Sequence, residues 1–246
     1  MNINDLEAEA IHFLTSEHRF IFEDLVVYSY KFLQSIFNNM GVAEGNKKKI
    51  ASSIILSRVM QDLRCVHLCA IRGYPGAAGT LAASIWELSY EIGYINLDDY
   101  DIEMWFSHNE VKRTETRYDV RIKKFLETIY KDESERNIEV ERSFADYSFL
   151  SAFKHGNSIT QLVTLAKRDG VIGTIDSKPN ISSESILMLC RIIFHACEYA
   201  IQAAKFHAMS YIPEGKSQDI SPTLEEIYER LRESFNYMDS LIVSRV

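Results

Sequence analysis

Arg72-Gly-Tyr-Pro-Gly-Ala-Ala-Gly79 separates two long apolar patterns that both have helical spacing, and this segment sets the architecture of the chain. Apolar residues recur three and four positions apart over residues 47–72 before it and over residues 75–95 after it. The glycines end the first helix, and Pro75 suits the first turn of the second. Because the turn is so short, the two helices are expected to pack as an antiparallel hairpin.

The second helix of this hairpin begins with unusually small side chains. They let its backbone approach a neighbouring helix closely before the larger Trp86 and Glu87 follow. The small residues are Ala77, Ala78, Gly79, Ala82 and Ala83.

Helical spacing also recurs over most of the remaining chain, so the sequence predicts an all-α fold. The segment 182–210 is apolar nearly all round and is expected to be the central, most buried helix. The other predicted helices cover residues 4–39, 118–129, 144–154 and 221 onward.

No interdomain linker or repeat interrupts the chain, and residues 1–246 are interpreted as one helical domain with six or seven helices. Asp169-Gly170 between two alternating runs predicts a small β-hairpin near residues 160–176. A helix over residues 159–167 is the open alternative.

Composition excludes several classes of protein. The net charge of −8 argues against a protein that coats nucleic acid over its whole surface. Charged residues interrupt every apolar stretch, and the acidic N-terminus has no secretory pattern, so a cytosolic protein without a membrane span is expected. Phosphate-loop, dinucleotide-binding, serine-hydrolase and zinc-protease motifs are absent, and no cofactor is predicted.

The four cysteines form two pairs, each on one helix face: Cys65 with Cys69, and Cys190 with Cys197. Two such faces would supply a four-thiolate metal site if they met. The alternative, which we favour, is that reduced thiols fill a helical core. No metal site is therefore predicted.

Arg72, Glu87 and His155 are the candidate catalytic residues, because antiparallel packing would bring them into one polar pocket. His155 ends a helical stretch and would serve as a general acid or base beside a carboxylate. The commoner role of a helix-terminal histidine, which we favour, is to cap carbonyls or to satisfy a buried carboxylate. Glu87 and Glu91 share a helix face, as metal-binding carboxylates do, but no Glu-x-x-His partner exists, which favours a polar edge or a salt bridge.

A basic stripe on the helix 118–129 and the residues before it is the candidate substrate-binding surface. Such a stripe can hold phosphates, although a solvated face paired with the acids between Asp132 and Glu141 is the commoner interpretation. The stripe consists of Arg113, Arg117, Arg121 and Lys124.

A metal-independent ribonuclease needs a base, an acid and a cation, which Arg72, His155 and Arg191 would supply if they converged. The sequence Arg191-Ile-Ile-Phe-His195 is similar to the Arg-x(4 to 6)-His motif of HEPN-family nucleases, but only three residues intervene here. His155 and the Arg191/His195 pair are therefore the two candidates for ribonuclease chemistry.

Arg72, the Ala-rich helix to Glu87 and Ser151-x-x-x-His155 together resemble a group of bacterial all-helical proteins of unknown function, some of them associated with phage resistance or abortive infection. This resemblance marks Arg72, Glu87 and His155 and implies no reaction. We expect a cytosolic bundle of bacterial defence or stress-response type that binds a protein partner or a second copy. The alternative is a HEPN-like ribonuclease that binds RNA.

Overall fold

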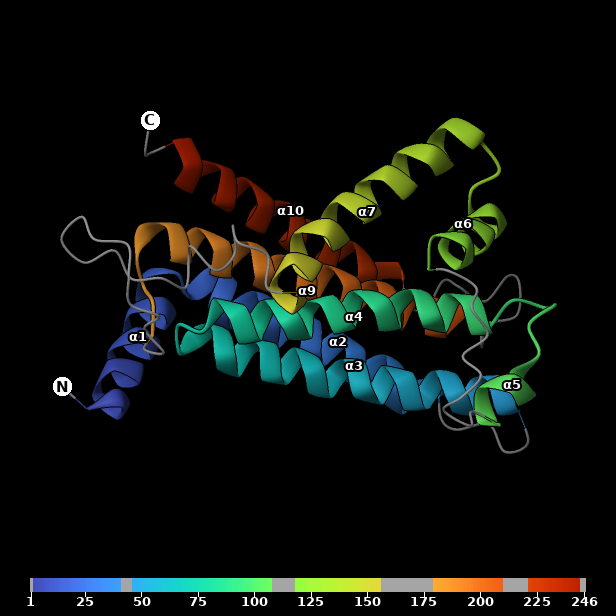
Figure 1. Cartoon of the computed structure of the whole chain (residues 1–246), viewed down its shortest axis with the longest axis horizontal. Helices are drawn as coiled ribbons and strands as arrows, with labels where there is room; N and C mark the ends of the chain where they lie inside the picture. Colours follow the sequence, from blue (N-terminus) through green and yellow to red (C-terminus); the bar gives the residue numbers. More distant parts are fainter. Residues whose placement is uncertain (1, 41–45, 108–117, 156–178, 210–220, 244–246) are drawn as a thin grey trace.

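In the computed structural model the chain is an all-α bundle, as predicted, and the structure describes residues 2–40, 46–107, 118–155, 179–209 and 221–243 (Figure 1). None of these residues lies in a strand. The predicted hairpin at 160–176 lies outside the described residues. The described part has more helices than the six or seven expected: α1 (Ile3–Glu17), α2 (Val26–Met40), α3 (Lys47–Ile71), α4 (Pro75–Ile95), α5 (Ile102–Phe106), α6 (Tyr118–Ile129), α7 (Glu133–Lys154), α9 (Ser183–Met209) and α10 (Ser221–Val243).

The helix predicted over residues 4–39 is divided by a π-helical turn, η1 (Phe20–Leu25). Helix α1 ends at His18, whose Nδ1 lies 2.8 Å from the hydroxyl of Tyr237 in α10. The helix predicted from residue 144 begins earlier, at Glu133, because Asp132 caps the N–H groups of Ser134 and Glu135. The first half of this helix is polar, so the spacing of apolar residues did not predict it.

Helices α3 and α4 form the predicted hairpin. Gly73 in the turn has φ of +79°, a conformation that glycine adopts without strain. The turn is anchored by Tyr74, whose hydroxyl donates a hydrogen bond to Glu7 of α1. This bond ties the N-terminal helix to the end of the hairpin.

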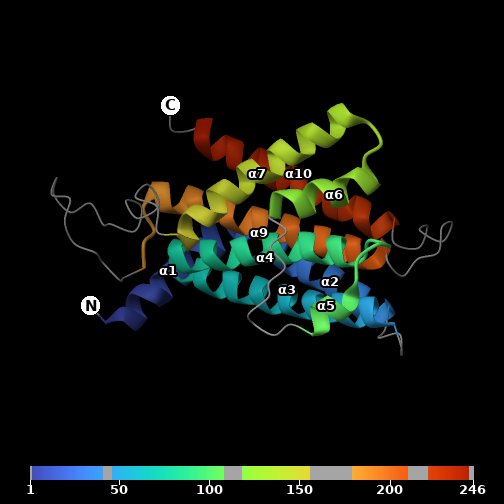
Figure 2. The same cartoon turned by 45° about the vertical axis from the view of Figure 1, so that its right-hand side comes forward.

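Helix α9 is the central element, as predicted, and α4 packs along it (Figures 1 and 2). It is long and apolar enough to cross a membrane, but most of its apolar part is buried inside the bundle, as in the core helix of a folded domain. Cys190 and Cys197 lie buried in this helix, and neither forms a disulfide within the described residues. Cys65 and Cys69 of α3 form none there either, and burial raises the pKa of Cys69 and, to about 12, that of Cys197.

The small residues at the start of α4 allow α7 to pack close to its backbone. A Cβ at Gly79 would lie 2.4 Å from the ring of Phe153 in α7, and one at Gly93 would lie 2.4 Å from the ring of Phe125 in α6. Further along α4, the ring of Trp86 stacks on Tyr147 of α7 with centroids 4.2 Å apart. Helix α7 therefore packs on α4 partly through stacked aromatic rings.

Candidate functional site

The three predicted catalytic residues have different partners. Arg72 ends α3, where its Nε lies 3.4 Å from Oε2 of Glu7 and its Nη1 donates to the carbonyl of Leu68. It therefore joins α1 to the α3–α4 turn. Neither of these two contacts reaches Glu87 or His155, and the catalytic role of Arg72 stays a prediction.

Glu87 holds α7 against α4. Its Oε1 accepts hydrogen bonds from the Tyr147 hydroxyl and from Lys154 Nζ, both at 2.8 Å. His155 follows Lys154 as the exposed C-cap of α7, and its backbone N–H donates to Ser151. The structure thus places Glu87 beside the residue that precedes His155, in an ion pair that joins two helices.

Two members of the predicted basic stripe can be placed, and both pair with acids. Arg121 donates to Glu91 of α4 at 3.0 Å, and its guanidinium lies 5.4 Å from the centre of the Tyr94 ring. Lys124 pairs with Asp99, and this pairing raises the pKa of Lys124. Arg113 and Arg117 lie outside the described residues. The acids come from α4 and the segment after it, rather than from 132–141 as expected.

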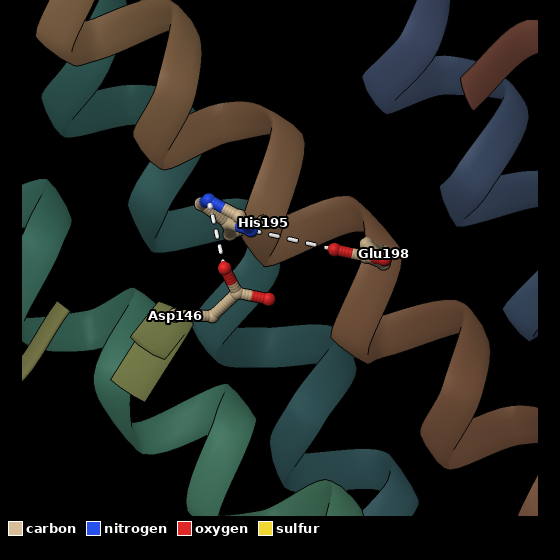
Figure 3. Close-up of side chains that lie close together, drawn as sticks. All are labelled: Asp146, His195 and Glu198. Carbon is tan, nitrogen blue, oxygen red and sulfur yellow. Dashed lines mark hydrogen bonds and ion pairs between the residues drawn. The ribbon is translucent and has the colours of Figure 1, made fainter. Parts of the chain in front are cut away.

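A polar cluster of Asp146, His195 and Glu198 joins α7 to α9 (Figure 3). Asp146 of α7 lies on one side of the His195 ring, with Oδ1 3.7 Å from Nε2, and Glu198 lies on the other, with Oε2 3.3 Å from Nδ1. Tyr199 donates to the second oxygen of Asp146 at 2.8 Å. Arg142 of α7 donates to Glu198 at 2.7 Å. Asp146 and His195 are buried, and Glu198 is nearly so.

The contacts of His195 assign its tautomer. Arg191 Nε donates to Nε2 at 3.4 Å, so this nitrogen accepts, and Nδ1–H donates to Glu198. The guanidinium of Arg191 also lies 4.0 Å from the centre of the Phe149 ring. In this arrangement the Glu198 carboxylate faces one nitrogen of the ring, and Arg191 and Asp146 lie near the other.

The charges of this cluster are mutually compensated. Burial acts to raise the pKa of Glu198, but the hydrogen bond from His195 and the charge of Arg142 outweigh it, so the pKa is lowered. Burial acts to lower the pKa of Arg142, but Glu139 and Glu198 raise it overall. Both groups stay ionised at neutral pH, and their attraction holds α7 against α9.

Asp146, His195 and Glu198 are residue types that bind metal ions, and their ligand atoms lie within 4.8 Å of one another. In the present geometry, however, the two carboxylates face different nitrogens of one ring (Figure 3). A metal ion takes one nitrogen of an imidazole, so an ion at Nε2 would leave Glu198 as a partner of Nδ1–H. The cluster suits an ion-paired helix contact better than a metal centre.

A second feature is an open pocket of about 430 Å³ on the outer side of α3, which we call the α3 surface. Its walls are apolar and small polar side chains with one arginine, and Ile54 among them is 51% exposed. The lining residues are Phe37, Ile50, Ser53, Ile54, Ser57, Arg58 and Gln61.

Sequence reasoning named Arg191 and His195 but missed Asp146, Glu198 and Arg142. A signal for Glu198 was available, since Arg191, His195 and Glu198 recur at helical spacing as a polar stripe in an otherwise apolar helix. Asp146 and Arg142 belong to α7, about fifty residues away, and no local pattern links them to that stripe.

No family model matches this chain, and the searches of curated proteins and of solved structures find no match either.

Proposed function

We propose that this protein acts by binding a protein partner, and that the α3 surface is where the partner docks. The observation that carries the proposal is that the exposed side chain of Ile54 lines an open pocket together with Phe37 and Ile50. An apolar anchor that fills such a pocket and excludes water is the usual centre of a binding interface. Single exposed apolar residues are common on surfaces, and it is the concave setting that distinguishes Ile54.

The charges nearest the pocket are paired within the chain. Helix α3 carries basic residues at Lys47, Lys48, Lys49, Arg58 and Arg64, in a chain whose net charge is −8. Its one acid, Asp62, is buried and accepts from Arg58 at 2.9 Å. Lys47 pairs with Glu103 at 2.6 Å, so the pocket is bordered by compensated charges, and a segment with an apolar anchor is the partner that complements it.

The cellular context of the proposal rests on the resemblance of Arg72, Glu87 and Ser151-x-x-x-His155 to bacterial all-helical proteins of unknown function, some of them associated with phage resistance or abortive infection. On that basis the protein belongs to a bacterial defence or stress response and acts in the cytosol. The clusters around Glu87 and His195 then hold α7 in place, and the partner is bound elsewhere.

The test is capture of partners from a bacterial lysate by the immobilised full-length protein. Ile54→Glu places a charge in the pocket and is expected to abolish capture, whereas Val120→Glu, at a similarly exposed apolar residue of α6, is the matched control. Circular dichroism verifies that both variants fold. Equal capture by wild type and Ile54→Glu, or no specific capture by wild type at all, would contradict the proposal.

A second candidate is metal-independent cleavage of RNA at Arg191 and His195. It is favoured by the tautomer of His195, in which Glu198 orients Nδ1–H and Nε2 carries the lone pair that a general base needs. Arg191, which is exposed, supplies a cation for a phosphate. It ranks second because His195 is only 7% exposed and the ring of Phe149 lies beside it.

This candidate is tested by incubating the protein with labelled RNA in the presence of a chelator. Cleavage by wild type that is lost in His195→Ala and in Arg191→Ala, with both variants folded, supports it. His155→Ala separates the two histidines predicted for this chemistry. An intact RNA after incubation with wild type rules the candidate out.

A further inference from the structure

Two of the four cysteines of the chain reach the surface, and both belong to α3: Cys65 is exposed and Cys69 is half-buried. Cys190 and Cys197 are 0% exposed inside α9. Among the described residues, no cluster of three His, Cys, Asp or Glu ligand atoms includes a cysteine, so the two pairs do not meet as a four-thiolate site. Core filling accounts for the α9 pair, but it does not account for the pair at the surface of α3.

The two thiols of α3 are neighbours. They are four residues apart in a continuous helix, and side chains at this spacing have Cβ atoms about 5–6 Å apart on one face. Burial is the main cause that raises the pKa of Cys69, and Cys65 raises it further, whereas Arg72 acts in the opposite direction. The thiol groups therefore interact electrostatically, and a cation between them would relieve the repulsion of two thiolates.

The spacing of the pair suits a bridging ion better than a disulfide. A disulfide needs Cβ atoms about 3.5–4.5 Å apart, which is closer than successive turns of a helix hold them. An ion bonded to two sulfurs at about 2.3 Å each allows those sulfurs to lie up to about 4.6 Å apart. The pair can therefore bind an ion while α3 stays helical, and the exposure of Cys65 gives the ion a way in.

The kind and number of ligands select the ion. Thiolates are soft ligands that favour Cu⁺, Zn²⁺ and iron–sulfur clusters. Structural Zn²⁺ takes four protein ligands, and iron–sulfur clusters are held by four cysteines, whereas Cu⁺ is stable with two thiolates. A pair of surface thiols with no third ligand among the described residues therefore fits Cu⁺.

We propose that Cys65 and Cys69 bind one Cu⁺ ion at the surface of α3. Each thiol loses its proton and donates a sulfur lone pair, so two neutral thiols and Cu⁺ give a bis-thiolate complex of charge −1 and two protons. No electron is transferred. The affinity should rise with pH, by about tenfold per pH unit for each thiol that is protonated before the ion binds.

Titration of the reduced full-length protein with Cu⁺ under nitrogen, in competition with a chromophoric Cu⁺ chelator, tests this inference. Wild type is expected to withhold one Cu⁺ per chain from the chelator. Cys65→Ser and Cys69→Ser should each weaken binding by more than about a hundredfold, because even the loss of a residue that only orients a metal ligand costs up to about that much. Cys65→Ser changes an exposed side chain and should fold normally, which circular dichroism verifies.

A relocated thiol provides the matched control. Gln61 is exposed on α3, and Gln61→Cys combined with Cys65→Ser keeps the number of cysteines while separating the α3 pair by two turns, about 12 Å. This variant should bind Cu⁺ as weakly as Cys65→Ser alone. Loss of all Cu⁺ from wild type to the chelator overturns the inference, as does one tightly bound Cu⁺ in Cys65→Ser or in the relocated variant.

Discussion

Gly79 of α4 lies so close to Phe153 of α7 that a Cβ added to it would be 2.4 Å from the Phe153 ring. The Phe153 ring therefore lies against the backbone of α4 at this position. This contact fixes the position of the C-terminal end of α7, and the ion pair between Glu87 and Lys154 depends on that position. The ion pairs of α7 follow from this packing, because the position of α7 on α4 determines which side chains of neighbouring helices its own side chains contact.

Gly79→Ala is therefore expected to destabilise the protein by about 1–3 kcal/mol, the cost of overpacking a filled contact. Alanine in a helix normally stabilises relative to glycine by up to about 1 kcal/mol, so the sign is reversed. Urea unfolding measures the effect, with Ser148→Ala at an exposed site of α7 as the control. A more stable Gly79→Ala variant would show that α7 does not lie so close to α4.

The pKa of His207 predicts how the free energy of unfolding depends on pH between about 4 and 6.5. It is buried with Nδ1 2.6 Å from the Ser52 hydroxyl, and burial, with a smaller contribution from Lys49, lowers its pKa from 6.5 to about 4. The unfolded chain then takes up this proton at higher pH than the folded one, so the contribution to stability is complete above pH 6.5 and is lost as the pH falls toward 4.

The loss attributable to His207 is about 3 kcal/mol over that interval, at about 1.4 kcal/mol per pH unit. His207→Gln should remove this slope, whereas His12→Gln on the exposed face of α1 should leave it. Thermal unfolding at a series of pH values measures both. A slope that is the same in wild type and His207→Gln would contradict the assignment.

Glu198 acts at lower pH. Its pKa in the folded protein lies below its ordinary value of 4.5, so its stabilising contribution is present above pH 4.5 and is lost as the pH falls through the lower folded value. Glu198→Gln leaves Arg142 and His195 without their carboxylate and should cost about 3 kcal/mol at pH 7, with a shallower acid transition. Glu225→Gln, an exposed acid of α10, is the matched control. Equal stability of Glu198→Gln and wild type would mean that this cluster does not hold α7.

The geometry of His195 also predicts the response to metal ions. Because its two nitrogens face different carboxylates, Zn²⁺ or Mn²⁺ should leave the melting temperature unchanged. A rise in melting temperature with Zn²⁺ that His195→Ala abolishes would show instead that the side chains rearrange around an ion.

The helical architecture was readable in the sequence. The apolar periodicity of 182–210 identified the buried helix α9, and Gly73 and Pro75 located the turn of the α3–α4 hairpin. Both are local signals, since spacing along one helix and the conformational limits of glycine and proline need no distant partner. Where a helix has a polar face, as in the first half of α7, the same signal failed.

The candidate sites were readable only in part. Arg191 and His195 share one helix face by their spacing, and the structure confirms that they contact each other. The pairing of Glu87 with Lys154, and of Arg121 with Glu91, depends on which helices are neighbours. The roles proposed for Arg72, Glu87 and His155 stay predictions.

The sequence alone determined where helices run and which of their faces are apolar, because both follow from side chains within a few residues of each other. Tertiary structure decided that Asp146 and Glu198 flank His195, and that Ile54 and Ile138 remain at the surface. The position of Asp146 beside His195 depends on how close α7 can come to α4, and thus on contacts such as Gly79 with Phe153, between residues far apart in the chain.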